Sequence, residues 1–180
     1  MARSVSRTRV VVRQSYYWPD QQLNFWIIVM LATGGTLIGV FASFMMDQQQ
    51  LQLGVPWIMP FGITVGSLTV VLILIFLLLI FQRRLLPGLV MVSCFILLIL
   101  YITGLVETAI QLFGPKGNII GNCQLLQEST GVSVNTLAWL EQNSVCQSWQ
   151  AVFAFWIIGG VFLVWLIVLG SMVARGGMGD

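Results

Sequence analysis

Residues 70–80 read VVLILIFLLLI, and they lie within a longer apolar run that covers residues 57–81. A helix formed by this stretch would present apolar side chains on every side, whereas the surface helix of a soluble protein has a polar face. About 20 apolar residues are enough to cross the ~30 Å hydrocarbon core of a bilayer as a helix. The stretch therefore predicts a membrane-spanning helix.

Three further runs have the same character, and they cover residues 23–46, 85–113 and 151–173. The composition agrees with a membrane protein, because 58% of the 180 residues are hydrophobic and only 8% are charged. Soluble domains have roughly one quarter of their residues charged. We therefore expect an all-α membrane protein, a four-transmembrane-helix bundle with a disulfide-closed second outer loop.

The basic residues predict how this bundle is oriented, because short cytosolic loops of membrane proteins are enriched in Lys and Arg. Seven of them fall on one side of the predicted spans: Arg3, Arg7, Arg9, Arg13, Arg83, Arg84 and Arg175. Lys116 falls on the other side. This pattern places both termini in the cytosol. It divides the chain into a basic N-terminal segment (1–22), a transmembrane domain (23–174, with its outer loop at 114–150) and a short tail (175–180).

The N-terminal segment leaves two locations open. The first apolar run is too long for a signal peptide, so we expect an uncleaved anchor in the plasma membrane or the secretory pathway. The opening MARSVSRTRVVVRQ is rich in Arg and Ser and has no acidic residue, as in mitochondrial transit peptides. The mitochondrial inner membrane is therefore the alternative.

Two cysteines, Cys123 and Cys146, lie in the second outer loop, on the side where disulfides form. We expect them to form a disulfide that stabilises the loop by roughly 3 kcal/mol. Redox catalysis is the alternative, but such enzymes carry C-x-x-C pairs, and this chain has none. Within the loop, residues 134–142 (VNTLAWLEQ) predict a short separate helix. Cys94, inside the third span, is expected to be a packing residue.

Glu107 is the one carboxylate that falls well within a predicted span. Intramembrane ionisable side chains are costly to bury and are therefore candidates for function. Glu107 lies close to the outer end of its span, with Thr103 and Gln111 one turn away as hydrogen-bonding neighbours. We expect a structural or interfacial role, with transport or partner binding as the alternative.

Small residues predict where the first two helices touch, because helices in lipid associate through close backbone approach. Two G-x-x-x-G motifs lie in adjacent spans, Gly35 with Gly39 and Gly62 with Gly66. We expect these four glycines to form the contact between the two helices.

The fourth span carries an unusual density of aromatic side chains around a glycine pair. Such surface is useful in lipid mainly where it packs into a shaped groove on a partner. We expect a partner or lipid interface formed by Phe153, Phe155, Trp156, Gly159, Gly160, Phe162 and Trp165. The alternative is that these side chains simply face acyl chains. Trp57 and Trp149 are expected at the outer membrane interface.

The chain has no histidine and no phosphate-binding glycine loop. The sequence therefore predicts no enzyme, and no catalytic, cofactor-binding or metal-binding residue. The expected partners are membrane lipid, with a structural lipid or sterol as a further possibility, and another integral membrane protein or a second copy. No nucleic-acid partner is expected, because the net charge is only +2.

The chain resembles the MARVEL-type tetraspan proteins, especially small fungal members. The resemblance rests on four spans, a short first outer loop, a longer second outer loop with a cysteine pair, and the sequence VCQSWQAVFAFWIIGGVFLVWLIVLGS entering the last span. It implies a four-helix bundle that organises membrane domains, trafficking or cell-surface assemblies, with Cys123 and Cys146 matching the loop cysteines. The claudin pattern, with its cysteines in the first outer loop, is missing.

These observations favour a non-enzymatic tetraspan protein that acts as a scaffold, organiser or accessory protein of the plasma membrane. The first alternative is a dedicated accessory subunit of a larger membrane enzyme or transporter, for example a cell-wall polysaccharide synthase. The second alternative is a thiol–disulfide or lipid-modifying membrane enzyme.

Overall fold

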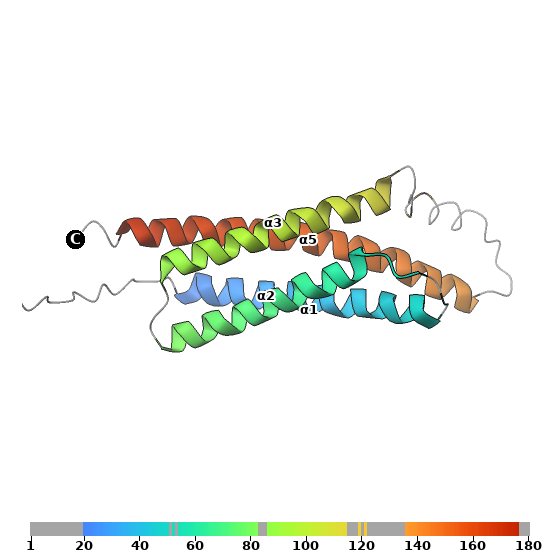
Figure 1. Ribbon diagram of the computed structural model, residues 1–180, viewed down its shortest axis with the longest axis horizontal. Helices are drawn as coiled ribbons and strands as arrows, with labels where there is room; N and C mark the ends of the chain where they lie inside the picture. The colour runs from blue at the N-terminus through green and yellow to red at the C-terminus, as the bar shows by residue number, and fades with distance from the viewer. Residues whose placement is uncertain are drawn as a thin grey trace, which may run out of the picture.

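The computed structural model describes residues 20–50, 52, 54–82, 86–114, 119, 121 and 136–176. Four long helices dominate these residues (Figure 1): α1 (Asp20–Gln50), α2 (Ile58–Phe81), α3 (Pro87–Phe113) and α5 (Thr136–Gly176). Each contains a stretch long and apolar enough to cross a membrane. For the described residues, the prediction of an all-helical fold with four helices long and apolar enough to cross a membrane is confirmed.

The first three helices begin and end close to the predicted positions, and α3 shows why. Pro87 is its first residue, a position where the missing N–H costs no helical hydrogen bond. Leu86 before it is extended, as the residue before a proline prefers. At the other end, the Gly114 N–H donates to the Ile110 carbonyl oxygen at 2.8 Å. A Cβ atom at Gly114 would clash with that oxygen, so a glycine suits the end of this helix.

The last helix corrects the sequence prediction. Residues 134–142 were expected to form a separate loop helix and residues 151–173 the span, but α5 is one continuous helix of 41 residues that begins at Thr136. The sequence from Thr136 to the predicted span contains no glycine or proline, so no residue stops the helix. The predicted outer loop 114–150 is accordingly shorter. At 1.5 Å per residue α5 is roughly 60 Å long, about twice the thickness of the hydrocarbon core.

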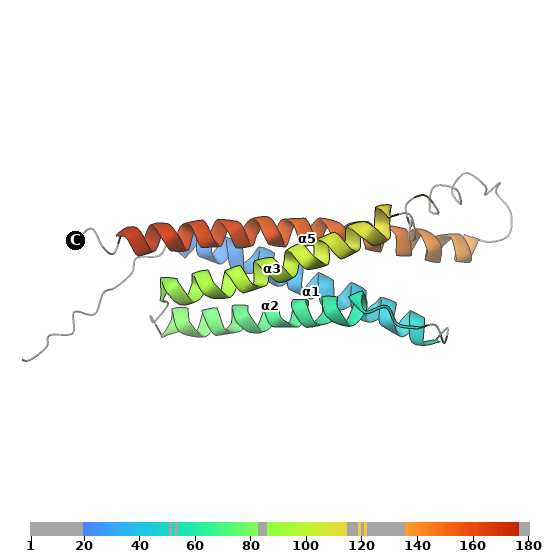
Figure 2. The ribbon, with the colours of Figure 1, turned by 45° about the horizontal axis from the view of Figure 1, so that its top comes forward.

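The helices form a ring in the order α1, α2, α3, α5, in which each helix contacts two neighbours. Neighbouring helices run antiparallel (Figure 2), and the closest pairs are α1 with α2 and α3 with α5. The start of α1 and the end of α5 lie at the same end of the bundle. We call this the Arg175 end, and the opposite end, where α1 finishes, the Asp47 end.

Large aromatic side chains fill the interior of the bundle. The biggest fully buried ones come from all four helices, and they include Trp26 and Phe41 from α1, Phe76 from α2, Tyr101 from α3 and Trp156 from α5. The buried polar side chains among the described residues are three threonines, Thr33, Thr69 and Thr108. Each donates its hydroxyl to the carbonyl four residues earlier in its own helix. Their polar groups are thus satisfied inside an apolar core.

The contact between α1 and α2 uses glycines, but not all of those predicted. Gly62 lies against the Phe41 ring, and a Cβ atom on Gly66 would lie 3.0 Å from the Gly34 carbonyl oxygen. Gly34 is therefore the packing glycine of α1. Gly35 and Gly39 are exposed, with open space where a Cβ would be. The prediction for Gly35 and Gly39 was wrong. Successive residues point about 100° apart around a helix, so Gly34 faces α2 and Gly35 does not.

Candidate functional site

Trp156, predicted to contact a partner, lies instead at the centre of the bundle and is only 1% exposed. Its indole ring lies edge-on to Tyr101 of α3 at 5.0 Å between centroids, and 6.4 Å from the rings of Phe41 and Phe61. It also covers Gly104 of α3, where a Cβ would collide with it. Trp156 therefore joins all four helices.

Gly159 is also internal, because the Tyr101 ring lies where its Cβ would be. The Tyr101 hydroxyl is 3.2 Å from the Thr69 hydroxyl of α2. Since Thr69 donates its single proton to the Val65 carbonyl, Tyr101 is the donor in this bond. Trp156 and Gly159 thus belong to the core, which corrects their assignment to an outer interface. The sequence could not show this, because the space that the Trp156 ring occupies is left by Gly104 of another helix, α3.

The remaining residues of the predicted interface lie nearer the surface. Phe153 packs edge-on against Phe113 of α3 at 5.9 Å, Phe155 is half-buried, and Gly160 faces open space. Phe162 and Trp165 form a cluster with Phe25 of α1, with ring centroids 5.4–6.4 Å apart. We call Phe25, Phe162 and Trp165 the aromatic cluster.

This cluster closes the contact between α1 and α5 toward the Arg175 end. Next to it, the Trp26 indole N–H donates to the Phe162 carbonyl oxygen at 2.9 Å. The cluster also reaches the surface, since Phe25 is 52% exposed and Trp165 is 36% exposed. An interhelical hydrogen bond and three rings thus hold the two helices together here while leaving aromatic surface available.

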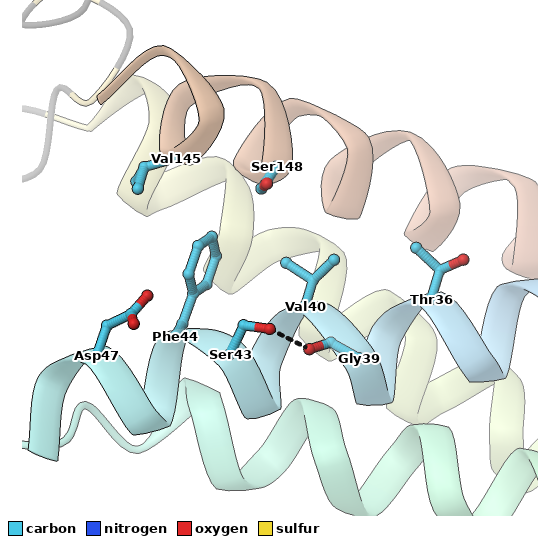
Figure 3. Close-up of a pocket in the computed structure, with 8 residues that line it drawn as sticks. All are labelled: Thr36, Gly39, Val40, Ser43, Phe44, Asp47, Val145 and Ser148. Carbon is cyan, nitrogen blue, oxygen red and sulfur yellow. Dashed lines mark hydrogen bonds between the residues drawn. The ribbon is translucent and has the colours of Figure 1, made fainter. Parts of the chain in front are cut away.

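Toward the Asp47 end the same two helices separate into a groove of about 310 Å³ (Figure 3). Its volume is at the lower end of the range of small-molecule pockets. It is lined by residues of α1 and α5: Thr36, Gly39, Val40, Ser43, Phe44, Asp47, Val145 and Ser148. At Gly39 there is open space where a Cβ would be, whereas at the aromatic cluster rings fill the contact between the two helices. We regard this groove as the candidate functional site.

The groove is lined by both apolar and polar side chains. Val40, Phe44 and Val145 supply apolar surface, and Phe44 is held by stacking on Trp149 at 5.3 Å. The Ser43 hydroxyl donates to the Gly39 carbonyl oxygen at 3.0 Å, so its oxygen remains available as an acceptor. Asp47 is exposed and has no ion-pair partner among the described residues. Trp149 is buried between α1 and α5, whereas Trp57 is exposed. The position of both at the outer membrane interface stays a prediction.

The described residues contain no group of three or more His, Cys, Asp or Glu side chains that could hold a metal ion. Glu107 is half-buried near the Asp47 end of α3. The Thr103 hydroxyl donates its proton to the Ile99 carbonyl oxygen, so it does not donate to Glu107 as suggested by the spacing. Glu107 lies on α3, which does not line the groove.

Other predicted positions are only partly described. Arg175 is exposed in the last turn of α5, where a cation interacts favourably with the helix dipole. Cys94 is a buried free thiol, whereas Cys146 is half-buried and is not free. Several predicted residues lie outside the described part of the chain: Arg3, Arg7, Arg9, Arg13, Arg83, Arg84, Lys116 and Cys123. The pairing of Cys123 with Cys146 stays a prediction.

The groove was not predicted from the sequence, although the sequence contains a signal for it. Gly39, Ser43 and Asp47 follow one another at intervals of four residues, so they lie along one side of α1.

Comparison with protein-family models, with curated proteins and with solved structures found no match to this chain.

Proposed function

We propose that this chain is a non-enzymatic tetraspan membrane protein that binds other membrane components through its outer surface, as a scaffold or organiser. The observation that carries the proposal is the packed interior. Channels and transporters need polar or ionisable groups along a path through the membrane. Here the described interior contains large apolar side chains and three threonines whose hydroxyls are bonded to their own helices. Its other polar groups include the Tyr101 hydroxyl, paired with Thr69, and the Trp156 indole N–H, which has no partner among the described residues.

The surfaces of the bundle differ in their suitability for a protein partner. The outer face of α3 presents mostly aliphatic side chains, such as Val92, Ile99 and Val106, that are about half exposed. Such a face suits lipid chains. The aromatic cluster of Phe25, Phe162 and Trp165 instead presents rings from two helices on one surface. We assign the protein-binding surface to this cluster, which keeps part of the predicted interface on α5.

Purification in mild detergent, followed by quantitative identification of associated membrane proteins, tests this assignment. Replacing Phe25 and Trp165 together with leucine keeps the surface apolar but changes its shape. We expect recovery of the main partner to fall about fivefold, a loss of ~1 kcal/mol of binding free energy. The control is Phe95→Leu, which replaces a ring on α3 that is 57% exposed, close to the 52% of Phe25. Unchanged recovery with the double variant would move the interface elsewhere.

The same experiment separates the organiser from a dedicated accessory subunit of a larger membrane enzyme or transporter. A subunit should be recovered with one large partner at a constant ratio, whereas an organiser should be recovered with many partners at low ratios. The length of α5 favours the subunit as the second candidate. Its first nine residues (136–144) extend roughly 14 Å beyond the membrane-crossing stretch Val145–Gly176 and offer a rigid contact outside the membrane.

We further propose the plasma membrane or the secretory pathway, with cytosolic termini. Support comes from the exposed Arg175 at the bundle end where α1 starts and α5 finishes, because basic residues favour the cytosolic side. Tags at both termini should be accessible only after the membrane is permeabilised, while a tag beside Lys116 should be accessible from the opposite side. Tags on the two termini that are accessible from opposite sides would contradict four spans.

The disulfide between Cys123 and Cys146 belongs to this proposal. It would attach the outer loop to the N-terminal part of α5, where Cys146 lies. Replacing either cysteine with serine should lower the folded yield, whereas Cys94→Ser should not alter the disulfide pattern. Finding that both Cys123 and Cys146 react with a thiol reagent in the native protein would disprove the pairing.

A further inference from the structure

The groove between α1 and α5 is about as long as one membrane leaflet is thick. Thr36 and Asp47 mark its two ends on α1, and eleven residues of helix cover roughly 16 Å. Half of a ~30 Å hydrocarbon core is about 15 Å. Thr36 lies near the middle of the membrane-crossing stretch Gln21–Gln50, and Asp47 lies near its end. A lipid chain of one leaflet therefore matches the groove in length.

Among the lining residues of the groove, the one charged side chain, Asp47, lies at one end, with the apolar Phe44 and Val145 beside it. Near the membrane middle, Val40 and Gly39 leave an apolar surface without bulk. Near the Asp47 end, Figure 3 shows the Asp47 carboxylate and the Ser148 hydroxyl beside the gap. Asp47 accepts hydrogen bonds only, and Ser43 has committed its proton to the Gly39 carbonyl. The polar end thus favours a donor with a positive charge.

Arg175, the one basic residue among those that the structure describes, lies at the opposite end of the bundle from Asp47. A primary ammonium group has three N–H donors and a positive charge, and it complements one carboxylate and nearby hydroxyl oxygens. A sterol offers one uncharged hydroxyl and leaves the carboxylate unpaired. An anionic headgroup without an amine is repelled by it.

We propose that the groove between α1 and α5 binds one phospholipid with a primary-ammonium headgroup. Its ammonium group pairs with Asp47 and contacts Ser43 and Ser148, and one acyl chain lies along Val40, Gly39 and Thr36. This site is separate from the aromatic cluster, which lies toward the Arg175 end of the same two helices. The proposal can therefore fail while the protein-binding surface stands, and the reverse also holds.

Native mass spectrometry of the full chain in detergent tests the proposal. The protein is titrated with phosphatidylethanolamine or with phosphatidylglycerol carrying identical acyl chains, and the fraction with one bound lipid is measured. We expect binding of one phosphatidylethanolamine about fivefold tighter than phosphatidylglycerol, which corresponds to ~1 kcal/mol. Equal affinity for the two lipids would overturn the proposal.

Two pairs of variants locate the binding site. Asp47→Asn should abolish the preference for phosphatidylethanolamine, while Glu107→Gln, which removes a carboxylate from α3, should keep it. Gly39→Leu should fill the groove and weaken binding of both lipids at least fivefold. Gly35→Leu adds the same side chain one turn away, outside the groove lining, and should leave binding unchanged. Both glycines have open space for a side chain, so the bundle should fold in either variant.

Three results would contradict the proposal. One is a preference for phosphatidylethanolamine that persists in Asp47→Asn. Another is equal weakening by Gly35→Leu and Gly39→Leu, which would mean that the helix surface in general takes up lipid. The third is displacement of bound phosphatidylethanolamine by cholesterol together with loss of cholesterol binding in Gly39→Leu, which would make the groove a sterol site.

Discussion

The contact between α3 and α5 and the contact between α1 and α5 share one helix and both contain glycines, yet the first is closed around its glycines and the second opens into a groove toward the Asp47 end. Gly104 and Gly159 each face an aromatic ring from the opposite helix, Trp156 and Tyr101 respectively. Gly39 faces nothing within 4 Å. The same residue type therefore makes tight packing where a large ring opposes it, and a groove where no ring does.

The largest effect should follow from removing the ring at the centre of the closed contact. Trp156→Ala leaves a cavity between four helices, and we expect the free energy of unfolding to fall by about 4 kcal/mol. The measurement is equilibrium unfolding by SDS in mixed micelles, followed by circular dichroism. Trp165→Ala, on a partly exposed ring, is the control and should cost less than ~1 kcal/mol. Similar costs for both would mean that Trp156 is not the centre of the bundle.

A smaller effect on the free energy of unfolding should come from replacing Gly159 or Gly160 of α5 with alanine. We expect the effect to have opposite signs at these two adjacent residues. Gly159→Ala places a Cβ against the Tyr101 ring, and we expect a loss of about 2 kcal/mol from overpacking. Gly160→Ala enters open space and should gain up to ~1 kcal/mol from the higher helix propensity of alanine. SDS unfolding of the two variants measures both. Destabilisation of equal size at both positions would contradict the arrangement of α3 and α5.

The smallest effect concerns the hydrogen bond between α2 and α3. Tyr101→Phe removes the hydroxyl that donates to Thr69 but keeps the ring against Gly159. Interhelical hydrogen bonds in membranes average ~0.6 kcal/mol, and we expect a loss of that size in the free energy of unfolding. Thr103→Val, which removes an exposed hydroxyl bonded only to its own helix, is the control. A cost above ~2 kcal/mol would show that the bond has a larger role than the average one.

The groove could be only partly predicted. Gly39, Ser43 and Asp47 share a side of α1 at a spacing that the sequence displays. Whether a groove exists there depends on α5, because Val145 and Ser148 form its other wall. These residues lie in the segment that sequence reasoning placed in a loop. The break expected between the loop helix and the span does not occur in α5.

The sequence by itself determined the four membrane-spanning helices, because the thickness of the bilayer requires apolar runs of a certain length and the chain contains four. Hydrophobicity could not decide which side of each helix faces inward, since lipid and the bundle interior are equally apolar. Only the tertiary structure paired Trp156 with Gly104 and Tyr101 with Gly159. It also left Gly35 and Gly39 outside. Packing in a membrane depends on matching side-chain shapes between two helices, and the sequence of one helix does not show the shape of the helix that packs against it.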